Sequence, residues 1–295
     1  MADERNGTRG AVVITGASSG IGAVCAFRLD GFGFRVFAGI RNEKDRNALL
    51  QGSAGRITHL FIDVTSEADL AAAASQVAGA VGSAGLSGLV NNAGIVIGGP
   101  LEFLPLGELR KQFEVNVLGQ IAVTQAFLPL LRLARGRIVN MSSIAGRVGF
   151  PFIGPYSASK YALEAISDAL RIELLPWGIS VSVIEPGDVA TPIWEKSLAA
   201  AQKTADSYPR QARDLYGPAL DAVTKAAEQT GAAGFPPDHV ACAVEHALTA
   251  GKPKTRYLVG RGVGFRAFFK TVLPDRLFDR LIIRHIGLPG TSRSL

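Results

Sequence analysis

Short apolar runs alternate along the chain with segments of helical periodicity. The apolar runs are too short for buried helices, so they are predicted to be buried β-strands. They cover residues 11–15, 34–39, 57–62, 86–90, 137–141, 179–184 and 256–259. Helical patterns fill the intervals, at residues 20–29, 44–50, 106–131, 155–175 and 237–248 and from Ser66 onwards, where Asp69 completes a capping box. This alternation predicts a doubly wound, parallel α/β sheet of about seven strands with helices on both faces.

No strand is predicted between residues 193 and 235. This helical insertion, which contains Trp194, Tyr208 and Tyr216, follows a strand end. Loops at the carboxyl edge of such a sheet usually contact ligands, so we expect a lid over the site. The predicted organisation is one domain over residues 1–260, which includes the lid at 193–235, and a helical extension over residues 261–295.

The net charge of +6 is concentrated in the last part of the chain. Residues 252–295 contain ten Lys or Arg against two Asp, a net of +8, and residues 1–251 have a net of −2. A slightly acidic body needs no polyanionic partner, so nucleic acid is not expected as a ligand. A content of 47% hydrophobic and 19% charged residues excludes disordered and coiled-coil proteins.

The basic extension also has an apolar stripe at helical spacing. Its members are Phe265, Phe268, Phe269, Val272 and Leu273, and, after Pro274, Leu277, Leu281 and Ile282. Basic amphipathic helices bind membrane surfaces, but most amphipathic helices pack against protein. The sequence leaves open a weak membrane contact and packing against the lid or a neighbouring subunit.

The remaining composition points to a reduced cytoplasmic protein without a metal. Cys25 and Cys242 cannot form a disulfide framework, and the charged first ten residues lack an apolar signal core. The four histidines, at positions 59, 239, 246 and 285, lack ligand spacing. Glu164, Glu173 and Glu185 have no motif partner and are expected to be solvated or to cap helices.

A glycine-rich loop follows the first predicted strand and opens a helix. It reads Thr15-Gly-Ala-Ser-Ser-Gly-Ile-Gly22. Gly16 permits a tight turn, Gly20 lets backbone amides approach a pyrophosphate, and Gly22 allows close helix–strand packing. Strand before and helix after favour a dinucleotide site over a plain glycine turn.

The end of the second predicted strand indicates which dinucleotide is bound. An Asp or Glu that binds the ribose 2′-hydroxyl of NAD is expected there, but the sequence has Arg41 and Asn42. A guanidinium suits a 2′-phosphate, so NADP is preferred, with NAD possible. Asp63, after the third strand, is expected either to accept a hydrogen bond from the adenine amino group or to shape a turn.

Tyr156 and Lys160 lie four residues apart at the start of a predicted helix, on one face. A neighbouring ammonium and an oxidised nicotinamide ring are expected to lower the pKa of the phenol toward neutral pH. Ser142 and Ser143 end the fifth strand, where a hydroxyl could bind a substrate carbonyl. Alternate strand residues point to opposite faces, so only one of them faces the site.

Together these motifs resemble the short-chain dehydrogenase/reductase family from about residue 10 to residue 191, and more closely its hydroxysteroid and retinol dehydrogenase branch. The further motifs are Asn91-Asn-Ala-Gly94, Asn116 and Pro186-Gly187. The resemblance implies a Rossmann-type fold in which Tyr156 is the general acid/base, Ser143 orients the carbonyl, Lys160 binds the nicotinamide ribose, and Asn116 holds a water of a proton relay. It implies that the cofactor contacts Gly16, Ser18, Ser19, Gly20, Ile21, Arg41, Asp63, Val64, Asn92, Ala93, Gly94, Tyr156, Lys160, Pro186, Gly187, Val189 and Thr191.

The resemblance implies an NADP(H)-dependent oxidoreductase acting on CH–OH and C=O groups. Apolar residues 144–155, including Val148 and Phe150, and residues 95–97 are expected to line the substrate pocket with Ser143 and Tyr156, which suits a lipophilic alcohol or carbonyl compound. Packing against the core or a partner subunit is the alternative for each apolar residue. Homodimers or homotetramers are expected by family analogy. The alternative function is a dinucleotide-sensing protein without turnover.

Overall fold

The computed structural model describes residues 9–51 and 55–288, and the last seven residues of the predicted extension lie outside them. Seven parallel strands form one sheet in the order β3-β2-β1-β4-β5-β6-β7. The strands are β1 Ala11–Ile14, β2 Arg35–Ile40, β3 Ile57–Phe61, β4 Gly88–Asn91, β5 Arg137–Met141, β6 Ser180–Pro186 and β7 Arg256–Val259. The predicted seven-stranded, Rossmann-type sheet is confirmed, with strand ends shifted by one or two residues.

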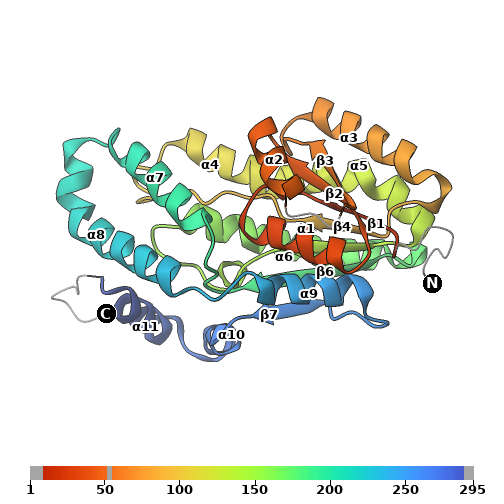
Figure 1. Ribbon diagram of the computed structural model, residues 1–295. Helices are drawn as coiled ribbons and strands as arrows, with labels where there is room; N and C mark the ends of the chain where they lie inside the picture. The colour runs from red at the N-terminus through yellow and green to blue at the C-terminus, as the bar shows by residue number, and fades with distance from the viewer. Residues whose placement is uncertain (1–8, 52–54, 289–295) are drawn as a thin grey trace.

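Helices cover both faces of the sheet (Figure 1). They are α1 Gly20–Gly31, α2 Glu43–Gln51, α3 Glu67–Val81, α4 Leu106–Phe113, α5 Gly119–Ala134, α6 Gly154–Glu173, α7 Ile193–Ala205, α8 Arg210–Ala233, α9 Asp238–Thr249, α10 Val263–Val272 and α11 Asp275–Ile286. Half of the predicted capping box at α3 is present: the Ser66 hydroxyl accepts a hydrogen bond from the Asp69 amide, but the Asp69 carboxylate accepts from the Ser66 hydroxyl and the Asp63 amide, and the Ser66 amide donates to the Asp63 carbonyl.

Two apolar clusters fill the space between the sheet and its helices. One joins β1, β2 and β6 to α1 and α9, and the other joins the opposite strand face to α3 and α5. Because inner strands of a parallel sheet are covered on both sides, nearly every residue of β1, β2, β4, β5 and β6 is buried, which explains their continuous apolar runs, whereas the edge strands β3 and β7 are partly exposed.

One helical run in the described part of the chain, Leu106–Ala134, is long and apolar enough to cross a membrane by length and composition. It consists of α4, a π-helical turn at Glu114–Leu118, and α5. In α5, Val123, Phe127 and Leu131 are fully buried in the cluster on the sheet. Its apolar composition is that of a core helix.

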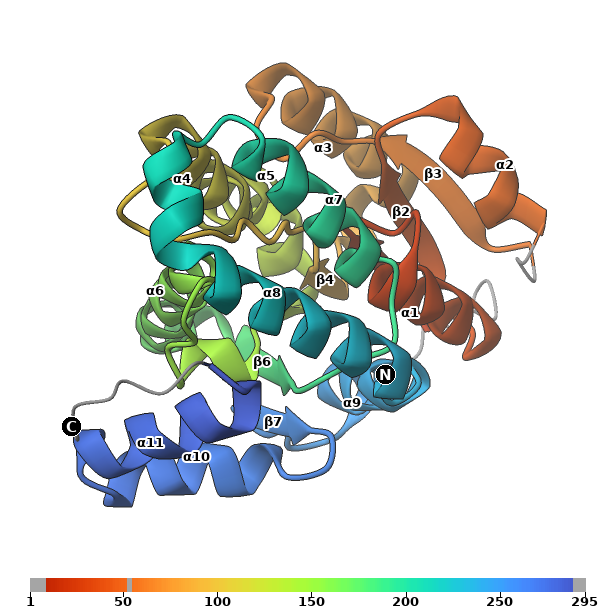
Figure 2. The ribbon, with the colours of Figure 1, turned by 90° about the vertical axis from the view of Figure 1, so that its left-hand side faces the viewer.

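The predicted insertion forms α7 and α8, which project from the carboxyl edge of the sheet (Figure 1). The chain after β7 forms α10 and α11, which lie side by side next to β7 (Figure 2). Pro274 separates these two helices, as the sequence predicted. The proposed domain boundary at residue 260 stays a prediction.

Candidate active site

The site is built where the strand order reverses, between β1 and β4. Thr15, after β1, is buried, and its hydroxyl accepts hydrogen bonds from the amides of Asn92 and Ala93, at 3.0 and 3.1 Å. The Asn92 side chain donates back to the carbonyls of Thr15 and Gly16, each at 3.0 Å. The two predicted cofactor motifs are therefore joined at the switch point, where open α/β sheets bind ligands.

The glycine loop has the backbone that its sequence required. Gly16 and Gly20 have φ values of +64° and +57°, a backbone conformation that residues other than glycine rarely adopt. A Cβ on Gly22 would lie 2.2 Å from the Gly16 carbonyl oxygen and 2.5 Å from Asn92 Nδ2. The predicted reason for Gly22 is therefore corrected, since it leaves room for the turn itself rather than for helix–strand packing.

The amino end of α1 suits an anion. Ser19, its N-cap, makes no side-chain capping hydrogen bond, and the first turn contains no acidic residue. The first amides of a helix lack intrahelical partners and carry a partial positive charge, so this end can hold a pyrophosphate. Ser18 and Ile21 are partly exposed beside it, and Ile21 also packs against the core.

The end of β2 presents no carboxylate, as predicted. Arg41 is exposed, and Asn42 caps α2 by accepting a hydrogen bond from the Asp45 amide at 3.0 Å. The Asp63 carboxylate accepts from the Thr65 amide and hydroxyl at 2.9 and 2.7 Å, which lowers its pKa, and Arg41 lowers that pKa further. The interpretation of Asp63 as a turn-shaping residue therefore holds. The second oxygen of its carboxylate takes no part in the hydrogen bonds of that turn.

The loop after β6 also borders the expected cofactor site, beside the glycine loop. The side chain of Thr191 lies beside the glycine loop, since a Cβ on Gly20 would be 3.3 Å from Thr191 Cβ. Buried Val189 pairs with Phe235, and its carbonyl accepts from Trp194 Nε1 at 2.8 Å. The lid is thus tied at both ends to the loop predicted to bind the nicotinamide carboxamide.

Four other predicted cofactor residues differ in accessibility. Val64 is buried and packs in the core against α5, and Pro186 is buried at the end of β6. Gly94 is exposed and Ala93 is partly exposed after β4. At the buried Val64 and Pro186, only the backbone or the edge of the side chain is available to a ligand.

The lid contributes a basic residue that sequence reasoning missed. Lys196, in the first turn of α7, lies with its Nζ 3.4 Å from the Ser19 hydroxyl. These residues are 177 positions apart, and Lys196 belongs to no motif, so only the fold could bring this ammonium to the phosphate end of the cradle.

Ser143, Tyr156 and Lys160 meet beside the end of β5. Tyr156 lies beside Ser143, whose hydroxyl favours the phenolate. Lys160 Nζ donates to the Met141 carbonyl at 2.7 Å and lies 5.7 Å from the centre of the Tyr156 ring. Ser142 points the other way, with its buried hydroxyl toward the Glu164 side chain. The alternation of side chains along the strand therefore separates the two serines, as expected.

Burial away from water is the main cause of the pKa shifts of Tyr156 and Lys160. Burial raises the pKa of Tyr156, and the Ser143 hydroxyl opposes this increase. Burial lowers the pKa of Lys160 to about 8, while the Glu164 carboxylate opposes that decrease. The expected lowering of the Tyr156 pKa depends on an oxidised nicotinamide ring beside the phenol as well as on the ammonium, so it stays a prediction for the cofactor-bound protein.

Asn116 lies in the π-helical turn between α4 and α5. Its side chain donates to the Ile95 carbonyl and accepts from the Ile95 amide, both at 2.9 Å, and donates to the Ser159 hydroxyl at 3.2 Å. Ser159 in turn donates to the Tyr156 carbonyl at 2.7 Å. The observed contacts make Asn116 a link between the loop after β4 and α6. Its expected water contact stays a prediction.

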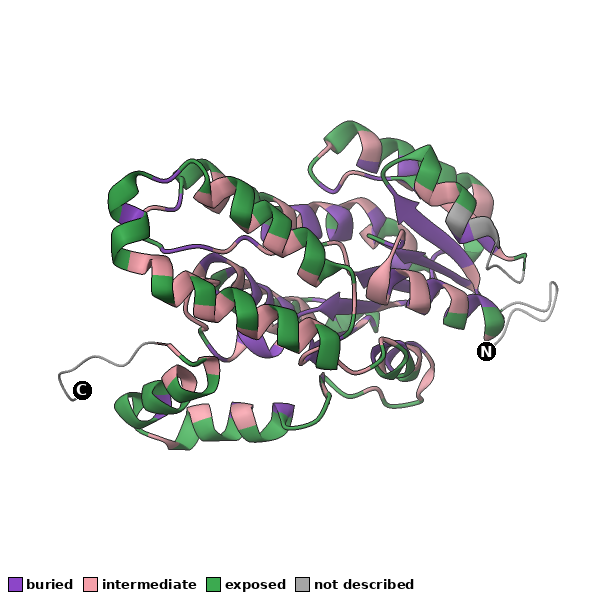
Figure 3. Cartoon of the chain, turned by 60° about the vertical axis from the view of Figure 1, so that its left-hand side comes forward, coloured by how far each residue is buried: buried purple, intermediate pink, exposed green. Residues whose placement is uncertain are grey.

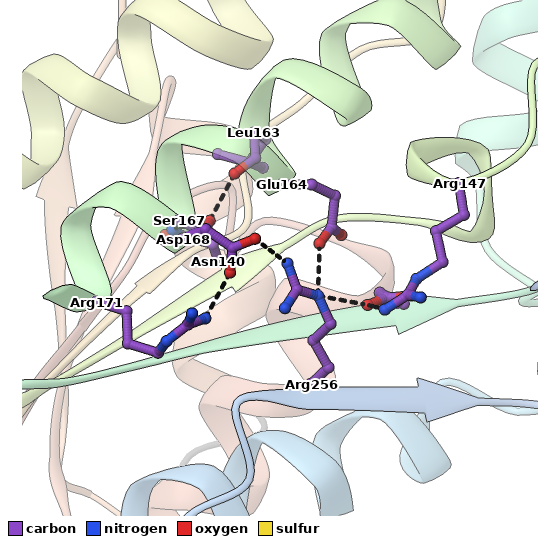
Figure 4. Close-up of polar contacts among 9 residues, drawn as sticks. Asn140, Arg147, Leu163, Glu164, Ser167, Asp168, Arg171 and Arg256 are labelled. Carbon is purple, nitrogen blue, oxygen red and sulfur yellow. Dashed lines mark hydrogen bonds and ion pairs between the residues drawn. The ribbon is translucent and has the colours of Figure 1, made fainter.

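A network of ion pairs lies between β7 and α6, the helix that holds Tyr156 and Lys160 (Figure 4). Arg256 of β7 contacts Glu164 at 3.1 Å, Asp168 at 2.7 Å and Glu185 at 3.4 Å. Arg147 ends the short helical turn that follows Ser143. Its Nε and Nη2 atoms both donate to the Glu185 carboxylate. Glu164 and Glu185 are buried, so the expectation that they are solvated or cap helices is wrong, whereas Glu173 is exposed as expected.

The expected substrate loop is only partly available to a ligand. Val148 is fully buried among residues of α10 and α11, and Phe150 packs against that cluster. For Val148 the alternative of core packing therefore holds in this structure. Phe152 instead lies toward the lid, with its ring 6.2 Å from that of Tyr216. Its φ of +64° and the 2.7 Å hydrogen bond from the Gly99 amide to its carbonyl hold the loop in this arrangement.

Among residues 9–51 and 55–288, no group of three metal-ligating side chains is found. His246 shares a 2.8 Å hydrogen bond with the Tyr257 hydroxyl, His59 contacts the Phe61 ring edge, and His239 stacks on Phe235.

Comparison with known proteins agrees with this geometry. Residues 10–202 match the family model described as short chain dehydrogenase. The chain is 35% identical to an NADPH-dependent 3-dehydrocapnine reductase of Ornithobacterium rhinotracheale over 93% of this chain and 96% of that protein. It is 39% identical to 17-beta-hydroxysteroid dehydrogenase type 6 of Homo sapiens, over 95% and 90%, and 37% identical to retinol dehydrogenase 5 of Mus musculus, over 96% and 91%.

A solved actinorhodin polyketide ketoreductase with NADPH has the same fold. It superposes with a TM-score of 0.71 at 29% identity, over 90% of this chain and 99% of that one.

Proposed function

From the premise that this chain belongs to the short-chain dehydrogenase family, on its hydroxysteroid and retinol dehydrogenase branch, we propose an NADP(H)-dependent oxidoreductase that interconverts a lipophilic alcohol and its carbonyl compound. The observation that carries the proposal is the meeting of Ser143, Tyr156 and Lys160 beside the glycine cradle. A protein that only sensed dinucleotide occupancy would not need a phenol and a hydroxyl side by side at this point.

The choice of NADP rests on the donors of the cradle. Arg41 offers a guanidinium at the end of β2, and among the described residues no acidic side chain follows it before Glu43. The named cofactors of the reductase from Ornithobacterium rhinotracheale and of the polyketide ketoreductase support this choice. NAD stays a possible second cofactor.

In reduction, the bound cofactor would supply a hydride to the carbonyl carbon. Ser143 would donate a hydrogen bond to the carbonyl oxygen, and Tyr156 would transfer its phenolic proton to that oxygen as negative charge develops there. The raised pKa of Tyr156 keeps this proton in place at neutral pH. The Lys160 ammonium, fixed by the Met141 carbonyl, would bind the ribose and stabilise the phenolate that remains.

The lipophilic class of substrate is supported by the aromatic rings around the lid. Phe103 and Phe152 both make edge contacts with Tyr216 of α8, with ring centres 5.9 and 6.2 Å apart. Tyr216 also donates to Glu102 at 2.8 Å, so α8 is held over the loop that follows β4. Apolar walls with few polar groups are typical of sites for lipophilic ligands. The homodimer or homotetramer and the cytoplasmic location remain proposals.

The test is loss of NADPH absorbance with a panel of ketones and aldehydes, for wild type, Tyr156→Phe and the control Tyr161→Phe. We expect Tyr156→Phe to lower kcat/KM by about 10²–10⁴-fold and to keep NADPH binding by calorimetry. Tyr161→Phe removes a hydroxyl that donates to the Arg147 carbonyl, five residues further along α6, and should keep most activity. Undiminished turnover by Tyr156→Phe would contradict the mechanism, and NADPH binding by wild type without turnover of any compound would favour the sensing protein.

A further inference from the structure

The helices after β7 pack on the catalytic body through one face only. Val263 and Ala267 of α10 and Phe278 of α11 are buried against Ile144 and Val148, which follow Ser143. Figure 2 shows α10 and α11 next to each other beside β7, at the edge of the molecule. The expected alternatives were packing against the lid or a neighbouring subunit, whereas this buried contact is with the segment after Ser143, and the opposite face is left to be explained.

That opposite face is apolar as well. Phe265, Phe268, Phe269 and Val272 follow each other at helical spacing on α10 and are 70%, 59%, 41% and 53% exposed. On α11, Leu277 and Leu281 are 44% and 47% exposed. We call these six residues the outer stripe. Exposed apolar side chains are common one at a time, but the four on one side of α10 form a patch of the kind that marks a contact surface.

The rings of the outer stripe contact each other. Phe265 stacks on Phe269 with ring centres 6.4 Å apart, and Phe268 lies 5.9 Å from Phe269. In Figure 3 the two helices are mostly exposed, apart from the residues that face the body. On α10 the buried Val263 and Ala267 and the exposed Phe265, Phe268 and Val272 occupy opposite sides of the helix.

The charge around the outer stripe is positive. Residues 261–288 contain six Lys or Arg and two Asp. Arg261, Arg276 and Arg284 are exposed, Arg266 is paired with Asp188, and Lys270 is paired with Asp275. A second copy of this face would bring like charges together, whereas the headgroups of anionic lipids would be attracted. Apolar rings flanked by arginines match a bilayer surface in both layers, acyl chains and headgroups.

The same helices contact the site. A Cβ on Gly187 would lie 2.7 Å from Val263 Cγ2, and the ion pair of Arg266 with Asp188, at 3.0 Å, fixes α10 to the loop after β6. α11 also contacts α8 of the lid. A surface that binds through the outer stripe would therefore lie close to the lid and to the loop after Ser143.

We propose that the outer stripe and its arginines bind the surface of an anionic lipid bilayer, with α10 and α11 parallel to that surface. The lid side of the site would then lie close to lipophilic substrate that is dissolved in the bilayer. Binding to the bilayer does not depend on the reaction, and only the delivery of substrate rests on the proposed function.

The test uses the full-length protein and sedimentation with vesicles of phosphatidylglycerol and phosphatidylcholine, or of phosphatidylcholine alone. The test variant carries Phe265→Ser, Phe268→Ser and Phe269→Ser. The control variant carries Leu106→Ser, Ile172→Ser and Leu175→Ser, three exposed apolar residues on other helices or turns. NADPH turnover of a water-soluble ketone without vesicles, together with circular dichroism, shows that each variant is folded.

We expect wild type and the control variant to bind the anionic vesicles, and the test variant to lose at least about tenfold in partition coefficient. Binding to neutral vesicles should be weaker, and high salt should release the protein. The proposal is overturned if wild type stays in solution, if the test variant binds as well as wild type, or if both vesicle types bind equally. It is also overturned if the test variant turns a dimer into a monomer while wild type ignores vesicles. If wild type shows no turnover of the ketone, that result would count against the proposed function alone.

Discussion

Arg256, the first residue of β7, and Glu164, in the middle of α6, are joined by a 3.1 Å ion pair across 92 positions of sequence. Glu164 lies one turn after Lys160 on the same helix, so this pair connects the sheet edge with the helix that holds the catalytic groups. The same guanidinium contacts Asp168 and Glu185, and Arg147 completes the network (Figure 4).

Replacing Arg256 should destabilise the fold strongly. In Arg256→Met the buried Glu164 carboxylate loses its cation and Glu185 keeps only Arg147, and breaking one partner of a buried pair costs about 3–5 kcal/mol. Urea unfolding measures this loss. Arg171→Met, which removes a more exposed partner of Asp168, is the control and should cost about 1 kcal/mol or less. Equal losses for the two variants would show that the network does not stabilise the fold.

The buried ammonium of Lys160 should make stability depend on pH. Its pKa falls from the usual 10.5 to about 8 on folding. Between these values the unfolded chain binds the extra proton, so the free energy of unfolding of wild type rises with pH through this window. Relative to Lys160→Met, wild type should gain at most about 3 kcal/mol from pH 8 to pH 10.5, at about 1.4 kcal/mol per unit. Urea unfolding at several pH values tests this, and parallel curves for the two proteins would contradict the shift.

Cofactor preference should depend on Arg41. Arg41→Asp replaces a guanidinium that pairs with a 2′-phosphate by a carboxylate that repels it and accepts from a 2′-hydroxyl. We expect the ratio of kcat/KM for NADPH to that for NADH to fall by about 10²-fold or more. Lys44→Asp makes the same charge change three residues later, in α2, and should leave the ratio within about threefold. An unchanged ratio in Arg41→Asp would remove this residue from the cofactor site.

Lys196 should contribute to binding of the cofactor phosphates. Its ammonium lies 3.4 Å from the Ser19 hydroxyl at the amino end of α1. In Lys196→Gln we expect the Kd for NADPH, measured by calorimetry, to rise about threefold to tenfold, and more at low salt than at high salt. Lys203→Gln, on the same helix and two turns further on, is the matched control. If both variants bind NADPH like wild type, α7 does not close over the phosphates.

Several parts of the site followed from local sequence. The alternation of apolar runs and helical patterns fixed the doubly wound sheet, because each strand buried on two faces must be apolar throughout. Gly16 and Gly20 followed from the turn that a phosphate-binding loop requires, and their positive φ values agree. The pleat of a strand predicted that only one of Ser142 and Ser143 faces the site, and the family resemblance selected Ser143. These are properties of neighbouring residues, so a sequence pattern can express them.

Other features were decided only when distant segments met. Burial raises the pKa of Tyr156, and burial is a property of the packed chain. Glu164 and Glu185 carry no motif, and Lys196 reaches Ser19 from 177 positions away. Val148 was expected at the substrate and is covered by α10 and α11 instead.

The sequence by itself therefore determined the strands, the turns and the types of group in the site, since these depend on backbone preferences and side-chain chemistry over a few residues. Only the tertiary structure decided which carboxylates are buried, which cation covers the cradle, and which face of the basic helices is left outward. Those outcomes depend on which surfaces lose water when segments far apart in the chain pack together.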